Sequence, residues 1–155
     1  MDFQICALPA QDFAALFALS DQDLARQQAR RMVVSETPGT PCRVSLQDAA
    51  VGETVLLLNY THQPADSPYR ATHAIFVREG AKEAEVAINE VPKVLRQRLI
   101  SLRLFDANHM MIDADVVDGA NLGSALSTAF DDPSVAYAHL HNAKPGCFHA
   151  AAHRA

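Results

Sequence analysis

The sequence predicts an α+β fold in which a mainly antiparallel sheet forms a single layer and three or four helices pack against it. Some segments alternate apolar and polar residues, as half-buried strands do, and others repeat apolar residues at helical spacing. These segments follow one another without the regular β-α-β order that predicts a parallel sheet. With 155 residues, 49% of them hydrophobic and 20% charged, the chain has the size and composition of one globular domain, which we expect to span residues 1–155.

The first elements are predicted to be one strand and two helices. Residues 3–8 form a short opening strand, and Pro9 stands where a helix can begin. Phe13 and Phe17 are four residues apart and would share the buried side of that helix. Residues 20–29 begin with the spacing of a capping box and contain few apolar residues, so we expect a second, more exposed helix.

The centre of the predicted sheet is a pair of long strands. A short strand over 31–35 precedes them and ends at the loop 37–41, which is too rich in Pro and Gly to continue a regular element. Residues 54–60 contain an unbroken apolar run, typical of a strand covered on both faces, and 73–78 is the expected antiparallel neighbour. The segment 63–70 between them is predicted to be an ordered surface loop.

The second half is predicted to contain two helices and three strands. Pro92 begins one helix, and the alternating segments 100–105 and 111–116 pair as a hairpin. Apolar residues recur at helical spacing over 122–130, which predicts the clearest helix of the chain. A last strand over 135–142 leads into a Pro/Gly-containing loop and a tail rich in Ala and His.

Charge and hydropathy exclude two classes of partner. The net charge is −5 and the Lys and Arg residues are scattered, so we expect no binding to nucleic acid. No apolar run approaches the length of a membrane helix, and residues 1–6 lack the features of a leader, so we expect no membrane partner and a cytoplasmic location. The three cysteines are an odd number, and free thiols are expected.

The strand over 135–142 contains a His-x-His pair. Because side chains alternate along a strand, His139 and His141 lie on one face, roughly 7 Å apart. Two such imidazoles can converge on one ion, with a third ligand from Cys147, His62 or His73. No short metal-binding motif accompanies the two histidines, so we expect no cofactor. In the interpretation in which they bind a metal, that metal is zinc. The other interpretation is that both histidines bond to neighbouring loops.

Two cysteines lie in Pro/Gly loops beside a cation. Cys42 precedes Arg43, and Cys147 follows Lys144 closely, and a neighbouring cation favours the reactive thiolate. Either thiol could act as a nucleophile with a histidine of the 139–141 pair as base. Buried cysteines that only pack are nevertheless commoner. The usual nucleotide-binding and hydrolase motifs do not occur.

Arginines offer a third chemistry. Arg43, Arg70 and Arg78, together with Tyr69, could converge on a carboxylate or phosphate, which the planar guanidinium suits. Solvated or ion-paired surface arginine is the plainer interpretation.

Four motifs carry a resemblance to a known family. They are Pro-Gly-Thr-Pro-Cys-Arg-Val-Ser-Leu-Gln-Asp-Ala at 38–49, Pro-Tyr-Arg at 68–70, Ile-Phe-Val-Arg-Glu at 75–79 and His-Leu-His-Asn-Ala-Lys-Pro-Gly-Cys-Phe at 139–148. In these motifs the chain resembles, nearly end to end, the bacterial domain of unknown function family 1203. The resemblance implies one common fold and places the Cys42, Tyr69–Arg70 and His139–Cys147 segments in the family pattern, but it implies no activity.

The leading hypothesis is a pocket that binds an anionic small molecule, because chemically rich ordered loops often carry function. The residues assigned to this pocket are Cys42, Arg43, Tyr69, Arg70, His139, His141, Asn142 and Cys147. One alternative is an enzyme that depends on a metal or on a Cys/His pair. Another is an interaction module that forms a homodimer.

Overall fold

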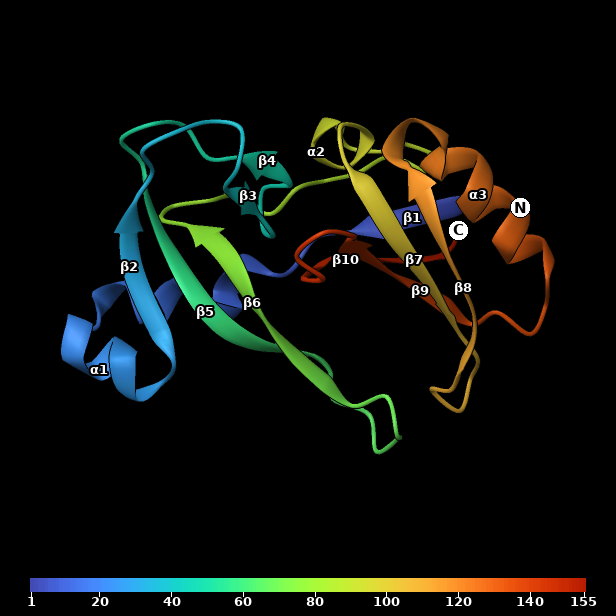
Figure 1. Ribbon diagram of the computed structural model, residues 1–155, viewed down its shortest axis with the longest axis horizontal. Helices are drawn as coiled ribbons and strands as arrows, with labels where there is room; N and C mark the ends of the chain where they lie inside the picture. The colour runs from blue at the N-terminus through green and yellow to red at the C-terminus, as the bar shows by residue number, and fades with distance from the viewer.

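The structure, a computed structural model that describes residues 1–155, contains two five-stranded sheets (Figure 1). The first sheet has the order β1-β10-β9-β7-β8 and the second the order β2-β5-β6-β3-β4. The strands of the first sheet are β1 (Phe3–Cys6), β7 (Leu99–Phe105), β8 (Met111–Asp118), β9 (Tyr137–Asn142) and β10 (Phe148–Arg154). Those of the second are β2 (Ala29–Val33), β3 (Pro41–Cys42), β4 (Gln47–Asp48), β5 (Thr54–Gln63) and β6 (Ala71–Arg78).

The α+β class is confirmed, but the prediction of a single sheet layer is wrong. All strand pairs are antiparallel except β3 with β6. The unpredicted strand β10 explains the difference, because it lies between β1 and β9 and so completes a sheet without β5 or β6. The central pair β5–β6 instead forms its own sheet with the short strands around it.

The helices are short, and they lie beside the sheets. The α-helices are α1 (Asp21–Arg26), α2 (Lys93–Arg96) and α3 (Leu122–Asp131), and the 3-10 helices are η1 (Ala10–Asp12), η2 (Ala14–Ala18) and η3 (Gly119–Asn121). The helix predicted after Pro9 is two 3-10 turns. The N–H of Leu16 bonds to the carbonyl of Phe13 and that of Leu19 to Leu16, so the apolar residues follow a three-residue spacing. None of the helices has the length and apolarity that crossing a bilayer requires.

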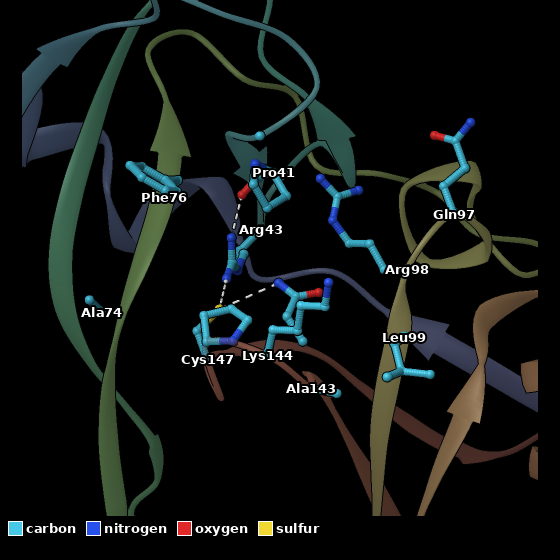
Figure 2. Close-up of a pocket in the computed structure, with 13 residues that line it drawn as sticks. Pro41, Arg43, Ala74, Phe76, Gln97, Arg98, Leu99, Ala143, Lys144 and Cys147 are labelled. Carbon is cyan, nitrogen blue, oxygen red and sulfur yellow. Dashed lines mark hydrogen bonds between the residues drawn. The ribbon is translucent and has the colours of Figure 1, made fainter.

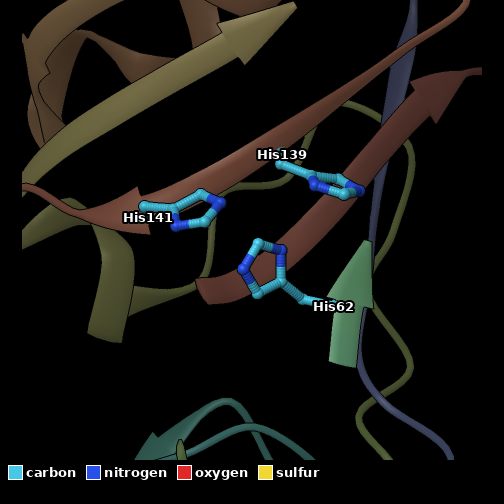
Figure 3. A group of neighbouring side chains, drawn as sticks. All are labelled: His62, His139 and His141. Atoms are coloured by element: carbon cyan, nitrogen blue, oxygen red, sulfur yellow. The ribbon is translucent and has the colours of Figure 1, made fainter. Parts of the chain in front are cut away.

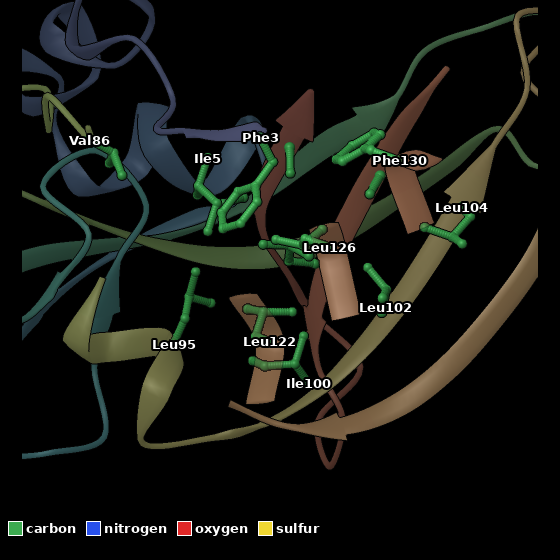
Figure 4. Close-up of a cluster of buried hydrophobic side chains, with 14 of the residues drawn as sticks. Phe3, Ile5, Val86, Leu95, Ile100, Leu102, Leu104, Leu122, Leu126 and Phe130 are labelled. Atoms are coloured by element: carbon green, nitrogen blue, oxygen red, sulfur yellow. The ribbon is translucent and has the colours of Figure 1, made fainter. Parts of the chain in front are cut away.

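Each sheet packs against its own hydrophobic core. The larger core has 17 buried residues, and in it α3 lays Leu122, Leu126 and Phe130 against Phe3 of β1 and Ile100 of β7 (Figure 4). Burying a side chain of this size stabilises the fold by about 1.5–3 kcal/mol. The second core has 11 buried residues and is built on β5 and β6. Domain organisation within residues 1–155 stays a prediction.

Side chains from both sheets meet where the sheets adjoin. In Figure 1 the second sheet lies on the left with α1, and the first lies on the right with α2 and α3. Phe148 of β10 belongs to the core of the second sheet rather than its own. Arg98 beside β7 pairs with Asp48 of β4 at 2.6 Å, and Gln63 of β5 donates to the Tyr137 hydroxyl at 2.8 Å. The junction therefore brings together residues far apart in the sequence.

Candidate functional site

A cavity of about 490 Å³ opens at this junction, and we call it the Arg43 cavity (Figure 2). Four segments form its walls: the loop around β3, strand β6, the end of α2 with the start of β7, and the turn between β9 and β10. Its lining residues are Gly39, Pro41, Arg43, Ala74, Phe76, Gln97, Arg98, Leu99, Asn142, Ala143, Lys144, Pro145 and Cys147.

Arg43 is the buried cation in the wall of this cavity. The residue is only 1% exposed. Its Nη1 donates to the Pro41 carbonyl at 2.5 Å, its Nε to the Phe148 carbonyl at 2.8 Å, and its Nη2 to Cys147 Sγ at 3.0 Å. No carboxylate is among its partners. Burial lowers the pKa of Arg43 and the nearby Cys147 opposes that effect, and a guanidinium keeps its charge in proteins.

Cys147 lies beside Arg43 and is held by a short chain of polar groups. Asn142 Nδ2 lies 3.4 Å from Cys147 Sγ, and Asn142 Oδ1 lies 3.1 Å from Nδ1 of His149. Because the amide oxygen can only accept, His149 carries its proton on Nδ1. Burial lowers the pKa of the fully buried His149 well below its ordinary value, so the ring is neutral at pH 7. His149 therefore orients Asn142 toward the sulfur.

The other two cations of the cavity differ in how they are paired. Arg98 makes two hydrogen bonds to the Asp48 carboxylate, at 2.6 and 3.1 Å, so its charge is neutralised within the protein. Lys144 is exposed at the rim and makes no ion pair. Arg43 and Lys144 thus leave the cavity with excess positive charge.

The structure brings only some of the residues of the predicted pocket together. Arg43, Asn142 and Cys147 line one cavity, whereas Cys42 is fully buried behind its wall. The Cys42 sulfur accepts from the backbone N–H groups of Ser45 and Arg78, at 3.5 and 3.3 Å, so it serves packing.

Tyr69 and Arg70 lie outside the cavity, in the loop between β5 and β6. Tyr69 packs edge-on against Phe105 at 6.1 Å, and Ser67 of the same loop bonds to the carbonyl of His109. The loop therefore contacts the β7–β8 hairpin. Arg78, the third arginine considered, forms an ion pair with Glu53 at 3.1 Å.

His139 and His141 face away from the cavity and meet His62 of β5 (Figure 3). We call these three residues the histidine cluster. One ring nitrogen from each lies within 4.8 Å of those of the other two. The ring of His62 is 5.9 Å from that of His139 and 4.9 Å from that of His141, centroid to centroid. Of the three residues considered as third ligand, the structure thus places His62 beside the pair.

The histidine cluster is electrically neutral at pH 7. Burial is the main cause that lowers the pKa of His62 to about 4 and the pKa values of His139 and His141 to about 3. The nearby positive charge of Arg103 lowers all three further. The rings therefore present lone pairs rather than charges.

The proposed Cys/His nucleophile pair is not formed. The side-chain partners of Cys147 Sγ are Arg43 and Asn142, and no histidine is among them. Sequence reasoning also missed Arg98 as a cavity residue. In the helix predicted from Pro92, Arg98 shares a side with Val94 and Leu95, which are buried, and a charged residue on the apolar side of a predicted helix is the signal that could have found it. In the structure α2 ends at Arg96, and Arg98 lies just before β7.

Comparisons with known proteins place the chain in a family. No match was found among curated proteins or among solved structures. A family model described as "Protein of unknown function (DUF1203)" matches residues 39–154, which include every segment that lines the Arg43 cavity and all three residues of the histidine cluster. The chain therefore belongs to this family, as its sequence motifs indicated, and the description assigns the family no activity.

Proposed function

We propose that the protein binds a small organic anion in the Arg43 cavity. The observation that carries this proposal is a buried guanidinium whose partners are two carbonyls and a thiol, with no carboxylate. A buried charge without an opposite charge is costly. An anion in the cavity would supply the missing negative charge.

The cavity also offers hydrogen-bond donors. A guanidinium has five N–H donors, and the three bonds of Arg43 leave two of them free. The planar arrangement of these donors suits a carboxylate or a phosphate group. Lys144 at the rim adds an attraction that guides an anion toward the opening.

The other walls favour an anion with an apolar body. Pro41, Phe76 and Leu99 line the cavity together with the polar groups. Its volume of about 490 Å³ lies within the range of about 300–1,000 Å³ of small-molecule sites. A carboxylate attached to a ring or short chain would use both kinds of wall.

Calorimetric titration of the tag-free chain with benzoate, succinate and inorganic phosphate tests the proposal. We expect benzoate to bind most tightly, because it has an apolar ring beside its carboxylate. Lys144→Ala should weaken benzoate binding a few-fold, whereas Lys82→Ala, which removes an exposed charge away from the cavity, should leave it unchanged.

A second variant tests the role of the guanidinium itself. Arg43→Lys keeps the charge but loses the planar set of donors, and it should abolish benzoate binding while circular dichroism still shows a folded chain. If it does not fold, Lys144→Ala against Lys82→Ala decides. The proposal is overturned if none of the three anions binds, if folded Arg43→Lys binds as the wild type does, or if the two lysine variants bind alike.

A further inference from the structure

We propose that His62, His139 and His141 bind a zinc ion between the two sheets, at a site separate from the Arg43 cavity. Three observations carry this inference: the convergence of the rings, the absence of partners for the converging nitrogens, and the local backbone that aims His62 at the other two.

The converging nitrogens are buried and have no hydrogen-bond partner. They are Nδ1 of His62, Nδ1 of His139 and Nε2 of His141. Figure 3 shows them directed toward the space between the three rings. Buried polar atoms nearly always have partners, and three such exceptions in one place indicate a missing group. One metal ion would satisfy all three lone pairs.

The distances suit such an ion after a small adjustment. Zinc binds imidazole nitrogen at about 2.0–2.1 Å, so ligands in a tetrahedral site lie roughly 3.4 Å apart. The ring nitrogens of the histidine cluster are already within 4.8 Å of one another. Small rotations of the rings would close the remaining gap.

The protonation of His141 is fixed by its other nitrogen. Nδ1 of His141 lies 2.9 Å from the Gly146 carbonyl, which can only accept, so Nδ1 carries the proton and Nε2 keeps its lone pair. Metal-binding histidines commonly donate their second nitrogen to a carbonyl in this way. Gly146 adopts a φ of 80°, which favours glycine, in the turn that presents this carbonyl.

A backbone irregularity aims His62 at the pair. The register between β5 and β6 shifts between Thr61 and Gln63, so His62 occupies a β-bulge at the end of a long strand. A bulge redirects a side chain and is frequent beside functional sites. His139 and His141, by contrast, reach the same point through ordinary alternation on β9.

The charged groups around the histidine cluster indicate which fourth ligand a bound zinc ion would take. The three histidines are neutral ligands, and no Asp or Glu belongs to the cluster. Arg103 of β7 is paired in register with His139, and its positive charge acts on all three rings. His73 of β6 and His153 of β10 are further groups that become positive in acid. Three neutral imidazoles would not offset the positive charge of a bound zinc ion. Its fourth coordination position would therefore take water, hydroxide or another anion.

A structural role for the rings is the competing interpretation. His62 stacks on Phe148 with ring centroids 5.4 Å apart, and His139 packs against the same ring at 5.1 Å. Packing accounts for the position of the rings but not for the orientation of three unpartnered nitrogens toward one point. That orientation is what a metal explains.

Metal titration of the tag-free chain tests the inference. After removal of metal by a chelator, the wild type should bind one Zn²⁺ per chain, and Co²⁺ should give the intense visible absorption of a tetrahedral site. His62→Gln should weaken Zn²⁺ binding about 100-fold or more, since loss of even a supporting group costs about 10–100-fold. His73→Gln is the matched control, because His73 is also half-buried on the second sheet, and it should bind Zn²⁺ as the wild type does.

His62 is the residue to replace because it is half-buried, whereas His139 and His141 are 6% and 1% exposed and their loss could unfold the chain. Circular dichroism of each variant checks folding. The inference is overturned if the wild type binds no Zn²⁺, if folded His62→Gln binds Zn²⁺ as well as His73→Gln does, or if only Cu²⁺ or Ni²⁺ binds. Benzoate binding is measured separately on the same variants, so failure of the zinc site and failure of the anion site are distinguishable.

Discussion

The Arg43 cavity and the histidine cluster lie at the same junction of two sheets, but their polar atoms are satisfied in opposite ways. Arg43 makes three hydrogen bonds, one to Pro41 of its own sheet and two across the junction to Cys147 and Phe148, and it lacks only a negative charge. The rings of the histidine cluster carry no charge and leave three buried nitrogens without any partner. The Arg43 cavity is therefore suited to bind an anion, and the histidine cluster is suited to bind a cation.

Of the two regions, only that of Arg43 supports the fold without a ligand. Two of the Arg43 bonds go to backbone carbonyls, those of Pro41 in the second sheet and Phe148 in the first, so the guanidinium joins the sheets whether or not a ligand binds. The converging nitrogens make no bond within the protein and contribute to stability only when a ligand is present.

Arg43→Met should lower the free energy of unfolding by about 3 kcal/mol or more, because the buried carbonyls of Pro41 and Phe148 lose their donor and each unpaired group costs about 1–3 kcal/mol. His62→Gln in metal-free protein should cost less than about 1 kcal/mol, because its buried nitrogen loses no bond. Urea unfolding with chelator present measures both. Equal losses would contradict the contrast.

Zinc should stabilise the wild type by about 2.7 kcal/mol when free Zn²⁺ is 100 times the dissociation constant. His73→Gln should gain the same amount and His62→Gln should gain almost none. Urea unfolding at matched free Zn²⁺ measures the three chains. A similar gain in His62→Gln would show that zinc binds elsewhere.

Acid should destabilise the metal-free chain. Burial is the main cause that lowers the pKa of His149 in the folded state, with the charges of Arg43 and Arg98 acting in the same direction. The unfolded chain then binds more protons below pH 6.5, so stability that is fully present above that value is lost as the pH falls toward the folded pKa.

The free energy of unfolding should therefore fall as the pH is lowered from 6.5 to 5, because the unfolded chain takes up a proton at His149 that the folded chain does not bind. The histidine cluster, whose pKa values are lowered to about 4 and about 3, acts in the same sense. Urea unfolding in a series of buffers measures the slope. A flat profile from pH 7 to 5 would show that these histidines are protonated in the folded chain.

Arg103→Gln should increase zinc affinity severalfold, because it removes a positive charge beside the histidine cluster. Arg96→Gln is the control, since Arg96 is exposed on α2 and does not act on the cluster. Competition with a coloured zinc chelator measures both affinities. Weaker binding in Arg103→Gln would mean that the guanidinium holds an anion that the metal needs.

Local patterns predicted most of the elements but not how the sheets divide. The helix over 122–130 and the β7–β8 hairpin were predicted because apolar spacing alone determines them. Strand β10 was missed because residues 148–154 are mainly Ala and His, which carry no strand signal. Without β10, the sequence could not show that β9 and β5 belong to different sheets.

Local sequence patterns also predicted only part of the two candidate sites. Alternation correctly placed His139 and His141 on one face, but choosing His62 as the third residue required the bulge that ends β5. Tyr69 and Arg70 looked like pocket residues because their loop is rich in polar groups, yet the β5–β6 hairpin carries them to the β7–β8 hairpin instead. Both outcomes depend on contacts between sheets, which no local pattern records.

X-ray absorption at the zinc edge of the zinc-loaded chain tests most directly the claim that the two regions bind different ligands. The separation of the regions predicts a first shell of three imidazole nitrogens and one further light atom, at about 2.0–2.1 Å, with no sulfur. A zinc–sulfur distance of about 2.3 Å would mean that a thiol such as Cys147 leaves Arg43 to bind the metal, and it would contradict that separation.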